Sequence, residues 1–470
     1  MKKVLKVTSP WSQETVCELP YDDPDSVERK LMLALGRFVA WKTVEIHERI
    51  QLVREGVRRL RAMAAEIARD ITLQMGKPIR EALREVETCC ERAEYMISIA
   101  TKTLAEEVLP AKEGFHLRIQ HEPLGVVLDL AAWNYPLLIP VNIVVPALLA
   151  GNTVLLKHSA RTPLCGLHFE RAFREGDLSS LVQNLVLGHA AVARLIGDFR
   201  VAHVAFTGSV EGGREVYQKT AERFIDAGLE LGGKDPAYIA EDADLDFAAE
   251  NVIDGACYNA GQSCCAVERV YVHRRLHDAF IEKARKVLEA YRLGDPMDEA
   301  TTMGPLASRG ALDLLEAQVA DAVRRGAKLL LGGKRVPGKP NLFPPTLLTD
   351  VPNDAVIMQE ESFGPVVPVL AVENDDEAFE RIGQTRYGLT ASIWTADRRR
   401  AERFAYKIDA GTIYQNRCDY LDPSLPWTGV RDSGKGSTLS RYGFYGLTRR
   451  KAIHFKAQPP RPGASPSSIP

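Results

Sequence analysis

The hydrophobic positions in residues 25–107 recur with the spacing of amphipathic helices. Val27, Leu31 and Leu35 are four positions apart, and the same pattern continues through residues 50–60, among many Glu and Arg side chains. We therefore expect a helical layer near the start of the chain.

From Gly125 onward the pattern changes to short, continuous apolar runs that alternate with helical stretches. Such runs are typical of strands buried in a parallel sheet that has helices on both faces. Strands of a first sheet are expected at 126–128, 154–156, 185–187 and 201–206, and strands of a second sheet at 237–239, 270–272, 328–331, 366–370 and 392–394. The predicted fold class is α/β, with a Rossmann-like dinucleotide-binding domain and a second α/β catalytic domain.

Two further runs, residues 115–119 and 452–455, alternate apolar and polar positions like half-exposed strands but fit neither sheet. We interpret them as a small β element that mediates oligomerisation, the alternative being a satellite hairpin on a monomer. The chain then divides into a dinucleotide-binding domain (1–112 and 124–232), a catalytic domain (233–432), oligomerisation strands (113–123 and 440–456) and a flexible, Pro-rich tail (457–470).

Composition narrows the class of protein. The 470 residues can bury a large core, and 60 basic against 62 acidic side chains leave no overall field that would recruit nucleic acid or an anionic membrane. The longest apolar stretch, residues 123–156, is interrupted by prolines and polar residues, and the first residues lack the pattern of a signal peptide. The eight cysteines form no CxxC pair, which speaks against a structural metal and a disulfide framework. We expect a cytoplasmic enzyme that acts on a small molecule.

Three short segments carry candidate catalytic groups. Cys264 follows a Gly-containing turn in residues 255–265 and fits an exposed nucleophilic thiol, although a buried structural cysteine is the simpler alternative. Glu230, among Leu and Gly in residues 229–234, is poorly solvated and suits a general base. Asn134, at the end of an apolar strand, could donate to a developing negative charge.

Two other segments suit a dinucleotide. Gly208 and Ser209 follow an expected strand and open an expected helix, so a pyrophosphate could approach backbone N–H groups there, although the pattern is not GxGxxG. Glu361 and Phe363 place a carboxylate beside an aromatic ring, which suits ribose hydroxyls and a flat ring.

From about residue 25 to 456 these segments resemble, in the same order, the aldehyde dehydrogenase superfamily of NAD(P)-dependent, non-acylating enzymes. That superfamily pairs the Glu of an ELGGK segment with the Cys of a GQxC segment 34 positions later, and here Glu230 and Cys264 are 34 apart. The resemblance implies that Cys264 rather than Cys265 attacks the aldehyde, that Asn134 and the Cys264 N–H hold the oxyanion, and that Glu230 activates water to hydrolyse the thioester. The NAD(P) contacts that it implies are Trp133, Lys157, Thr207, Gly208, Ser209, Leu231, Glu361 and Phe363.

The sequence departs from the superfamily pattern at two places. Ala160, next to Arg161, replaces a Glu that disfavours a 2′-phosphate, so we expect NADP to be accepted beside NAD. Ile143 and Thr438 replace a lysine–glutamate pair proposed in relatives as a proton exit. The chain is thus expected to be an outlying member that releases its proton by another route.

The resemblance also implies which residues line the substrate pocket. They are Tyr135, Leu138, Ile139, Tyr258, Ser263, Cys265, Asp419, Leu421 and Trp427. This mostly apolar lining favours uncharged aliphatic or aromatic aldehydes, whereas an inward-turned Arg417 would favour a succinate-semialdehyde type of substrate.

Other readings stay open at this point. One alternative is a catalytically silent relative. The other is a CoA-acylating relative, against which Glu230 argues. A disulfide between Cys264 and Cys265 could also switch the enzyme off. Family and strand pattern together imply a homodimer or homotetramer.

Overall fold

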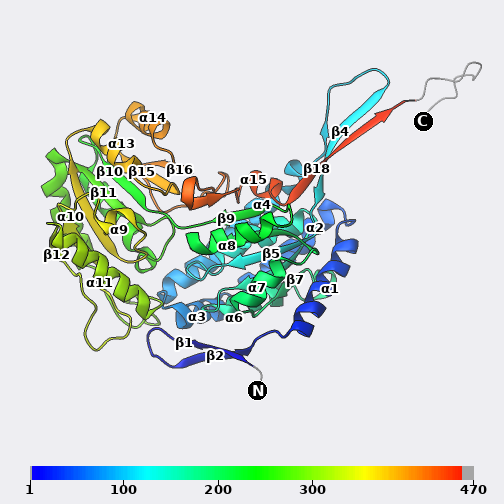
Figure 1. Ribbon diagram of the computed structural model, residues 1–470, viewed down its shortest axis with the longest axis horizontal. Helices are drawn as coiled ribbons and strands as arrows, with labels where there is room; N and C mark the ends of the chain where they lie inside the picture. Colours follow the sequence, from blue (N-terminus) through cyan, green and yellow to red (C-terminus); the bar gives the residue numbers. More distant parts are fainter. Residues whose placement is uncertain (1–2, 458–470) are drawn as a thin grey trace, which may run out of the picture.

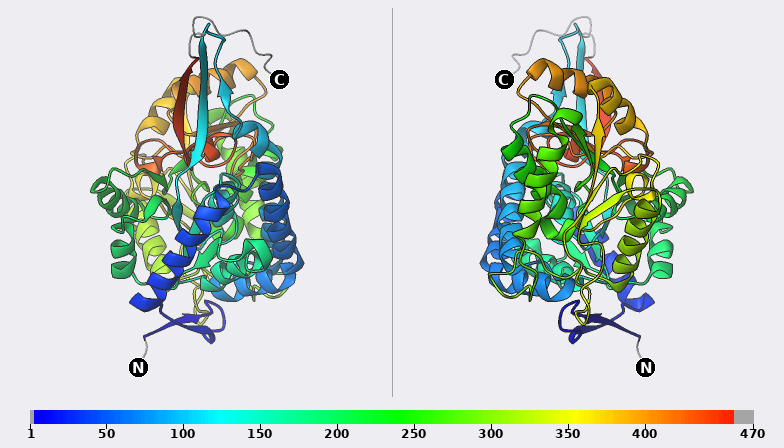
Figure 2. Two further views of the ribbon diagram at one scale, coloured as in Figure 1. Left: turned by 90° about the vertical axis from the view of Figure 1, so that its right-hand side faces the viewer. Right: turned by 90° about the vertical axis from the view of Figure 1, so that its left-hand side faces the viewer.

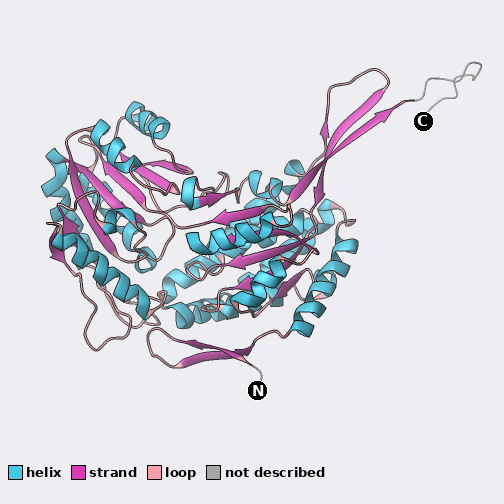
Figure 3. Ribbon diagram, in the orientation of Figure 1, coloured by secondary structure: helices cyan, strands magenta, loops and turns pink. Residues whose placement is uncertain are grey.

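The computed structural model describes residues 3–457 of the chain. Two mainly parallel sheets, each with helices packed on it, form the body, and a strand pair projects from the body as an arm (Figures 1 and 3). Ala457 is the only described residue of the expected tail. Among residues 3–457, no helix combines the length and the apolar composition needed to cross a membrane.

The chain opens with a hairpin and then forms the expected helical layer. The hairpin of β1 (Val4–Thr8) and β2 (Thr15–Pro20) was not expected, because most of its side chains are exposed and no apolar run marks it. The helices that follow are α1 (Pro24–Trp41), α2 (Ile46–Ala62), α3 (Ala64–Met75) and α4 (Ile79–Thr103).

The first sheet has the strand order β17-β9-β8-β5-β6-β7 and is parallel except for β17 at its edge. Its strands are β5 (Val126–Ala131), β6 (Thr153–His158), β7 (Val182–Asn184), β8 (Val201–Thr207), β9 (Ala227–Glu230) and β17 (Gly434–Lys435). The helices along it are α5 (Leu138–Leu149), α6 (Pro163–Ala172), α7 (His189–Ile196) and α8 (Val210–Ala221).

One expected strand of this sheet was wrong. Residues 185–187 follow the strand β7 instead of forming it, since only the Leu185 N–H continues the pairing with β6. The run is apolar because Leu185 and Leu187 are buried in the core beneath the sheet, while Val186 hydrogen-bonds to Asp22.

The second sheet has the order β12-β13-β14-β11-β10-β15-β16, with β12 antiparallel at its edge. Its strands are β10 (Asp235–Ile239), β11 (Val267–His273), β12 (Lys328–Leu331), β13 (Thr346–Thr349), β14 (Val366–Val372), β15 (Thr390–Trp394) and β16 (Thr412–Gln415). The helices between them are α9 (Leu245–Cys257), α10 (His277–Glu289), α11 (Arg309–Arg324), α12 (Val356–Gln359), α13 (Asp375–Gly383) and α14 (Arg398–Lys407). The short strands β13 and β16 carry too few residues for a pattern to show.

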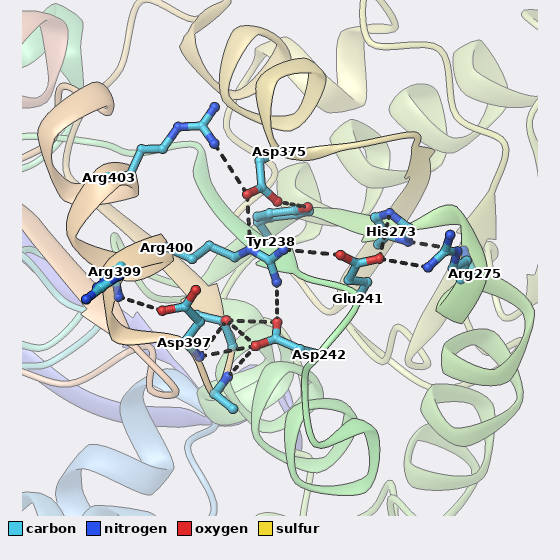
Figure 4. A network of polar contacts seen from close by, with 12 residues as sticks. Tyr238, Glu241, Asp242, His273, Arg275, Asp375, Asp397, Arg399, Arg400 and Arg403 are labelled. Atoms are coloured by element: carbon cyan, nitrogen blue, oxygen red, sulfur yellow. Dashed lines mark hydrogen bonds and ion pairs between the residues drawn. The ribbon is translucent and has the colours of Figure 1, made fainter.

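Ion pairs fasten two outer helices to the end of β10 (Figure 4). Arg400 of α14 contacts Glu241, Asp242 and Asp375, and the Tyr238 hydroxyl donates to Asp375 at 2.7 Å. The Arg400 side chain is largely buried from solvent. The network therefore holds α13 and α14 in place more firmly than isolated, solvent-exposed ion pairs would.

The arm is a three-stranded antiparallel sheet of β3 (Glu107–Val108), β4 (Phe115–Pro123) and β18 (Thr448–Lys456). β4 and β18 pair along their whole length, from Phe115 opposite Lys456 to Pro123 opposite Thr448, and extend beyond the helices (Figure 2). The short helix α15 (Tyr442–Tyr445) precedes β18 at the base of the arm.

Candidate functional site

Four of the expected site segments meet at one edge of the first sheet. Asn134, Lys157, Gly208 and Glu230 lie at or just beyond the carboxyl ends of β5, β6, β8 and β9. The connections reverse direction between β5 and β8, and ligands of open α/β sheets bind outside the strand ends at such a reversal.

Asn134 is held between the helical layer and the segment that carries the catalytic candidate Cys264 (residues 258–265), called the cysteine loop below. Its Nδ2 donates to the Gln262 carbonyl at 3.2 Å, two residues before Cys264. Its own carbonyl accepts from Lys77 Nζ and from Asn259 Nδ2, both at 3.0 Å. These bonds join the Asn134 and Cys264 segments, which are 130 positions apart in the chain.

Lys77 and Glu85 form a buried ion pair beneath this loop. Glu85 also accepts the N–H of Leu137 at 2.9 Å, just before the first turn of α5. Both residues were missed by the sequence analysis, because a charged residue in an amphipathic helical layer looks like a surface residue unless its partner is known.

The cysteine loop carries local backbone strain. Asn259 and Ala260 adopt left-handed conformations with φ of 53° and 55°, which cost on the order of 1–3 kcal/mol per residue. Gly261 follows with φ of 69°, and a Cβ there would lie 2.4 Å from the carbonyl of Gly364. The loop leaves the Cys264 side chain partly exposed, whereas Cys265 is buried.

Glu230 ends β9 with its carboxylate bound by two threonines. Thr207 Oγ1 donates to it at 3.3 Å, and Thr438 Oγ1 donates to its other oxygen. Burial raises the pKa of Glu230 above its usual value, while the hydrogen bonds from Thr438 and Thr207 and the charge of Arg92 oppose the rise. This is the environment that the Leu and Gly neighbours led us to expect for a general base.

The two glycines after Glu230 bring three segments into contact. A Cβ at Gly233 would lie 2.5 Å from the Cys264 carbonyl oxygen, so only glycine permits this approach. A Cβ at Gly232 would lie 2.7 Å from Glu361 Oε1, and the Gly233 N–H donates to that same oxygen at 3.2 Å. The Glu230, Cys264 and Glu361 segments therefore share one compact region.

The N-terminus of α8 offers a place for a pyrophosphate. Ser209 caps the helix by accepting the Gly212 N–H at 3.2 Å. The Phe206 ring lies beneath the turn, where a Cβ at Gly208 would approach it to 2.6 Å. Helix N-termini with exposed N–H groups bind phosphates, so this end of the sheet fits a dinucleotide.

The remaining expected cofactor residues surround this turn and the Glu361 segment. Lys157 is half-buried with no ion pair to a carboxylate in residues 3–457, and burial lowers its pKa. Trp133 and Phe363 meet edge to face at 5.6 Å, and Leu231 is buried. The Arg161 guanidinium lies 5.2 Å from the Trp133 ring and donates to the Ala307 carbonyl, so it already has partners.

Several of the expected pocket residues interact with Asp419. Its carboxylate accepts from Ser263 Oγ at 2.9 Å and from the Cys265 thiol at 3.0 Å, and burial raises the pKa of Asp419 to about 6. Trp427 and Cys265 belong to one small apolar cluster, against which Cys264 and Leu421 pack. Leu138 and Ile139 begin α5, Tyr135 lies under the Lys77 ammonium at 4.1 Å, and burial raises the pKa of Tyr258.

Two arginines bear on which substrates the pocket could accept. Arg417 is exposed and stacks on the Tyr420 ring at 3.5 Å, so it does not turn inward. Arg92 of α4, which was not expected, is buried, and its Nε has no hydrogen-bond partner among the described residues. Its charge acts on the pKa of Glu230 and Cys265, which places it near both.

Comparisons with known proteins identify the family of the chain. The model of the aldehyde dehydrogenase family matches residues 1–453. The NADP-dependent succinate-semialdehyde dehydrogenase of Mycolicibacterium paratuberculosis is 34% identical over 453 residues, which cover 96% of each chain. That of Deinococcus radiodurans is 34% identical over 454 residues, which cover 96% of this chain and 95% of the relative.

Solved structures show the same fold. Lactaldehyde dehydrogenase from Escherichia coli superposes with a TM-score of 0.92 at 30% identity, covering 97% of this chain and 96% of that one. An NAD-dependent aldehyde dehydrogenase from Sinorhizobium meliloti reaches 0.94 at 31% identity, covering 98% and 93%. These matches confirm both the predicted fold class and the resemblance, and the chain therefore belongs to the aldehyde dehydrogenase family, as an enzyme that oxidises aldehydes with NAD(P).

Proposed function

We propose that Cys264 is the nucleophile, Asn134 the oxyanion donor and Glu230 the general base of this aldehyde dehydrogenase. The observation that carries the proposal is the contact of the three segments, through the Gly233 approach to Cys264 and the Asn134–Gln262 hydrogen bond. The Cys264 thiolate adds to the aldehyde carbon, and the Asn134 amide and the Cys264 N–H stabilise the resulting alkoxide. Glu230 then takes a proton from the water that hydrolyses the thioester.

When bound, NAD(P)+ would supply the hydride acceptor for oxidation of the thiohemiacetal. The α8 N-terminus at Gly208 and Ser209 would hold its pyrophosphate, and the half-buried Lys157 ammonium suits a ribose hydroxyl or phosphate. Thr207, Leu231, Trp133, Glu361 and Phe363 would surround the rest of the molecule.

Variants of the three residues test the mechanism. Cys264→Ala should lower kcat/KM at least a thousandfold, and Asn134→Ala about a hundredfold, the usual effect of losing one oxyanion donor. Glu230→Gln should still form about one NAD(P)H per site and then stall, because only hydrolysis needs the base. Cys265→Ser is the matched control and should retain turnover, whereas a Cys264→Ala enzyme as fast as the native one would contradict the assignment.

We propose that NADP is accepted beside NAD. Ala160 is exposed and brings no negative charge near the ribose site. Since Arg161 is engaged with Trp133 and Ala307, the absence of repulsion supports this proposal more than an arginine contact does. Comparing kcat/KM for the two cofactors tests it, and a preference for NAD of several hundredfold would contradict it.

For the substrate, the apolar and aromatic lining around Cys264 favours uncharged aliphatic or aromatic aldehydes. Trp427 and Leu421 belong to the apolar cluster at the two cysteines, and the carboxylate of Asp419, which accepts from Cys265, would repel a substrate carboxylate. Turnover of hexanal and benzaldehyde well above that of succinic semialdehyde is the expected result.

A second candidate substrate class, the semialdehydes that bear a carboxylate, is favoured by Arg92. This buried guanidinium near Glu230 has no ion pair in residues 3–457, and a substrate carboxylate would supply one. The named activity of the two relatives points the same way. If this candidate is right, Arg92→Met raises KM for succinic semialdehyde at least tenfold and leaves that for hexanal unchanged.

We further propose a cytoplasmic homodimer or homotetramer assembled through the β4–β18 arm, following the division into domains expected from the sequence. The projection of the arm from the body and its exposed apolar residues support this assembly. Light scattering of the purified protein measures its mass directly.

A further inference from the structure

A cavity of about 50 Å³ lies beside Glu230 on the first sheet. Ile143 of α5 and Thr438, whose hydroxyl donates to Glu230, both line it. A cavity of this size can hold water, for which about 10–15 Å³ is enough.

The cavity follows one face of β8 and β9. Thr207 pairs with Glu230 and Ala205 with Gly228. Because side chains alternate along a strand, Thr207, Ala205 and His203 share a face of β8, and Glu230, Gly228 and Asp226 continue it on and just before β9. These six residues, which we call the β8/β9 channel, all line the cavity.

Small residues keep the middle of the β8/β9 channel open. Ala205 and Gly228 lie between the Glu230 end and the His203 end, and a Cβ at Gly228 would lie 3.8 Å from His203 Nε2. Gly228 thus adds no side-chain atoms to the space between Glu230 and His203.

The other end of the β8/β9 channel reaches solvent. His203 is buried, and its Nδ1 has no hydrogen-bond partner among the described residues, as expected for a ring that faces unfilled space. Beyond it, the Asp226 side chain is 71% exposed and forms an ion pair with Lys435 Nζ at 2.7 Å.

We propose that the β8/β9 channel is the proton exit of this enzyme, an inference that rests on the role of Glu230 proposed above. The proton that Glu230 takes from the hydrolytic water passes to water in the cavity and returns Glu230 to its carboxylate. One ring nitrogen of His203 accepts that proton while the other releases one toward Asp226, from which it enters bulk water. Each turnover thus moves one proton outward, and every group regains its starting state.

The charged neighbours of the channel are compatible with this path. Burial lowers the pKa of His203 to about 4, so the ring is neutral between transfers, with Asp226 and Lys435 as the charges that act on it. Asp129 of β5 lies beside Ala205, and burial and the charge of Glu230 raise its pKa well above the usual value, which disfavours its ionised form. Arg92 acts on Glu230 from α4 and favours its return to the carboxylate.

Two variants of the intact enzyme test the proposal. His203→Leu removes the relay ring, and Ala205→Val narrows the channel without changing any titratable group. In each we expect kcat at least fivefold below native while the first NAD(P)H per site forms at the native rate, because hydride transfer precedes the step that needs the exit. If His203→Leu does not fold, Ala205→Val decides the question.

Val204→Ile is the matched control, since it adds one methylene to the same strand on the opposite, core-facing side. It should turn over like the native enzyme, and an equal loss of kcat there would show that distortion of β8 is the cause and overturn the proposal. A folded His203→Leu enzyme within twofold of native kcat would also overturn it. Loss of the first NAD(P)H in His203→Leu would overturn it as well, because the defect would then precede the proton release. The roles of Cys264 and Glu230 are tested separately by Cys264→Ala and Glu230→Gln.

Discussion

At the scale of single residues, the sequence identified the groups at strand ends but not the groups that hold them. Glu230 and Cys264 could be found because their motifs and spacing are visible in one dimension. The hydrogen bond of Thr438 to Glu230 and the roles of Lys77 and Arg92 could not, because they depend on contacts with segments more than fifty positions away. A threonine, or a lysine in a short connection between helices, carries no local mark of such a contact.

Thr438 should tune the pH dependence of the reaction. Its hydroxyl is the strongest of the groups that lower the pKa of Glu230, so Thr438→Val should raise that pKa further. Because the base must be ionised, the acidic limb of the kcat profile should move to higher pH. Thr448→Val, which removes a hydroxyl bonded to the Phe444 carbonyl instead, is the control and should leave the profile in place.

Asp419 should make folding stability depend on pH. Its pKa rises from 3.8 to about 6 on folding, so the folded protein binds this proton more tightly and loses stability as pH rises through 6. The Asp419→Asn protein has no carboxyl group at this site and therefore does not lose stability in this way. Its Tm relative to that of the native protein should be higher at pH 8 than at pH 5. The control is Asp422→Asn, because hydrogen bonds from Ser424 lower the pKa of the native Asp422 carboxyl. The Tm of this variant relative to native should not be higher at pH 8 than at pH 5.

At the scale of elements, long periodic segments were predictable, whereas among the four-residue strands β12, with its apolar run, was found and β13 and β16 were not. The helical layer and the central strands of both sheets have enough residues to show a period. The strand expected at residues 185–187 fell in the wrong place because a buried connection is as apolar as a buried strand. β13 and β16 have four residues each, and their pairing partners decide that they are strands.

The Lys77–Glu85 pair links the ends of α3 and α4 to the loop before α5, so its loss should affect both stability and rate. Lys77→Met leaves Glu85 buried without its cation, which should cost about 3–5 kcal/mol, and removes a donor from the Asn134 carbonyl. We expect a lower Tm and a lower kcat.

Adding Glu85→Gln should recover part of that Tm, because it removes the uncompensated charge. Arg80→Met, at an exposed position of the same helix, should change neither quantity. Unchanged melting of Lys77→Met would contradict the structural role of the pair.

At the scale of the whole molecule, the arm exposes apolar side chains that the described part of the same chain does not cover. Phe455 on β18 is 57% exposed and Val108 on β3 is 79% exposed, far from the core of either sheet. We expect the charged variant Phe455→Asp to lower the mass seen by light scattering toward that of a monomer. Phe224→Asp replaces a fully exposed phenylalanine outside the arm and should leave the mass unchanged.

The strand β17 has a consequence for the order in which the protein can be made. It pairs with β9, and Ser433 beside it bonds the Leu231 N–H and the Gly232 carbonyl, about two hundred positions upstream. A growing chain on the ribosome must therefore carry an open strand edge at Glu230 until its last tenth has been synthesised, and open edges invite association with other chains. Fragments that stop before residue 433 can complete neither this edge nor the active centre, so activity arises only at the end of translation.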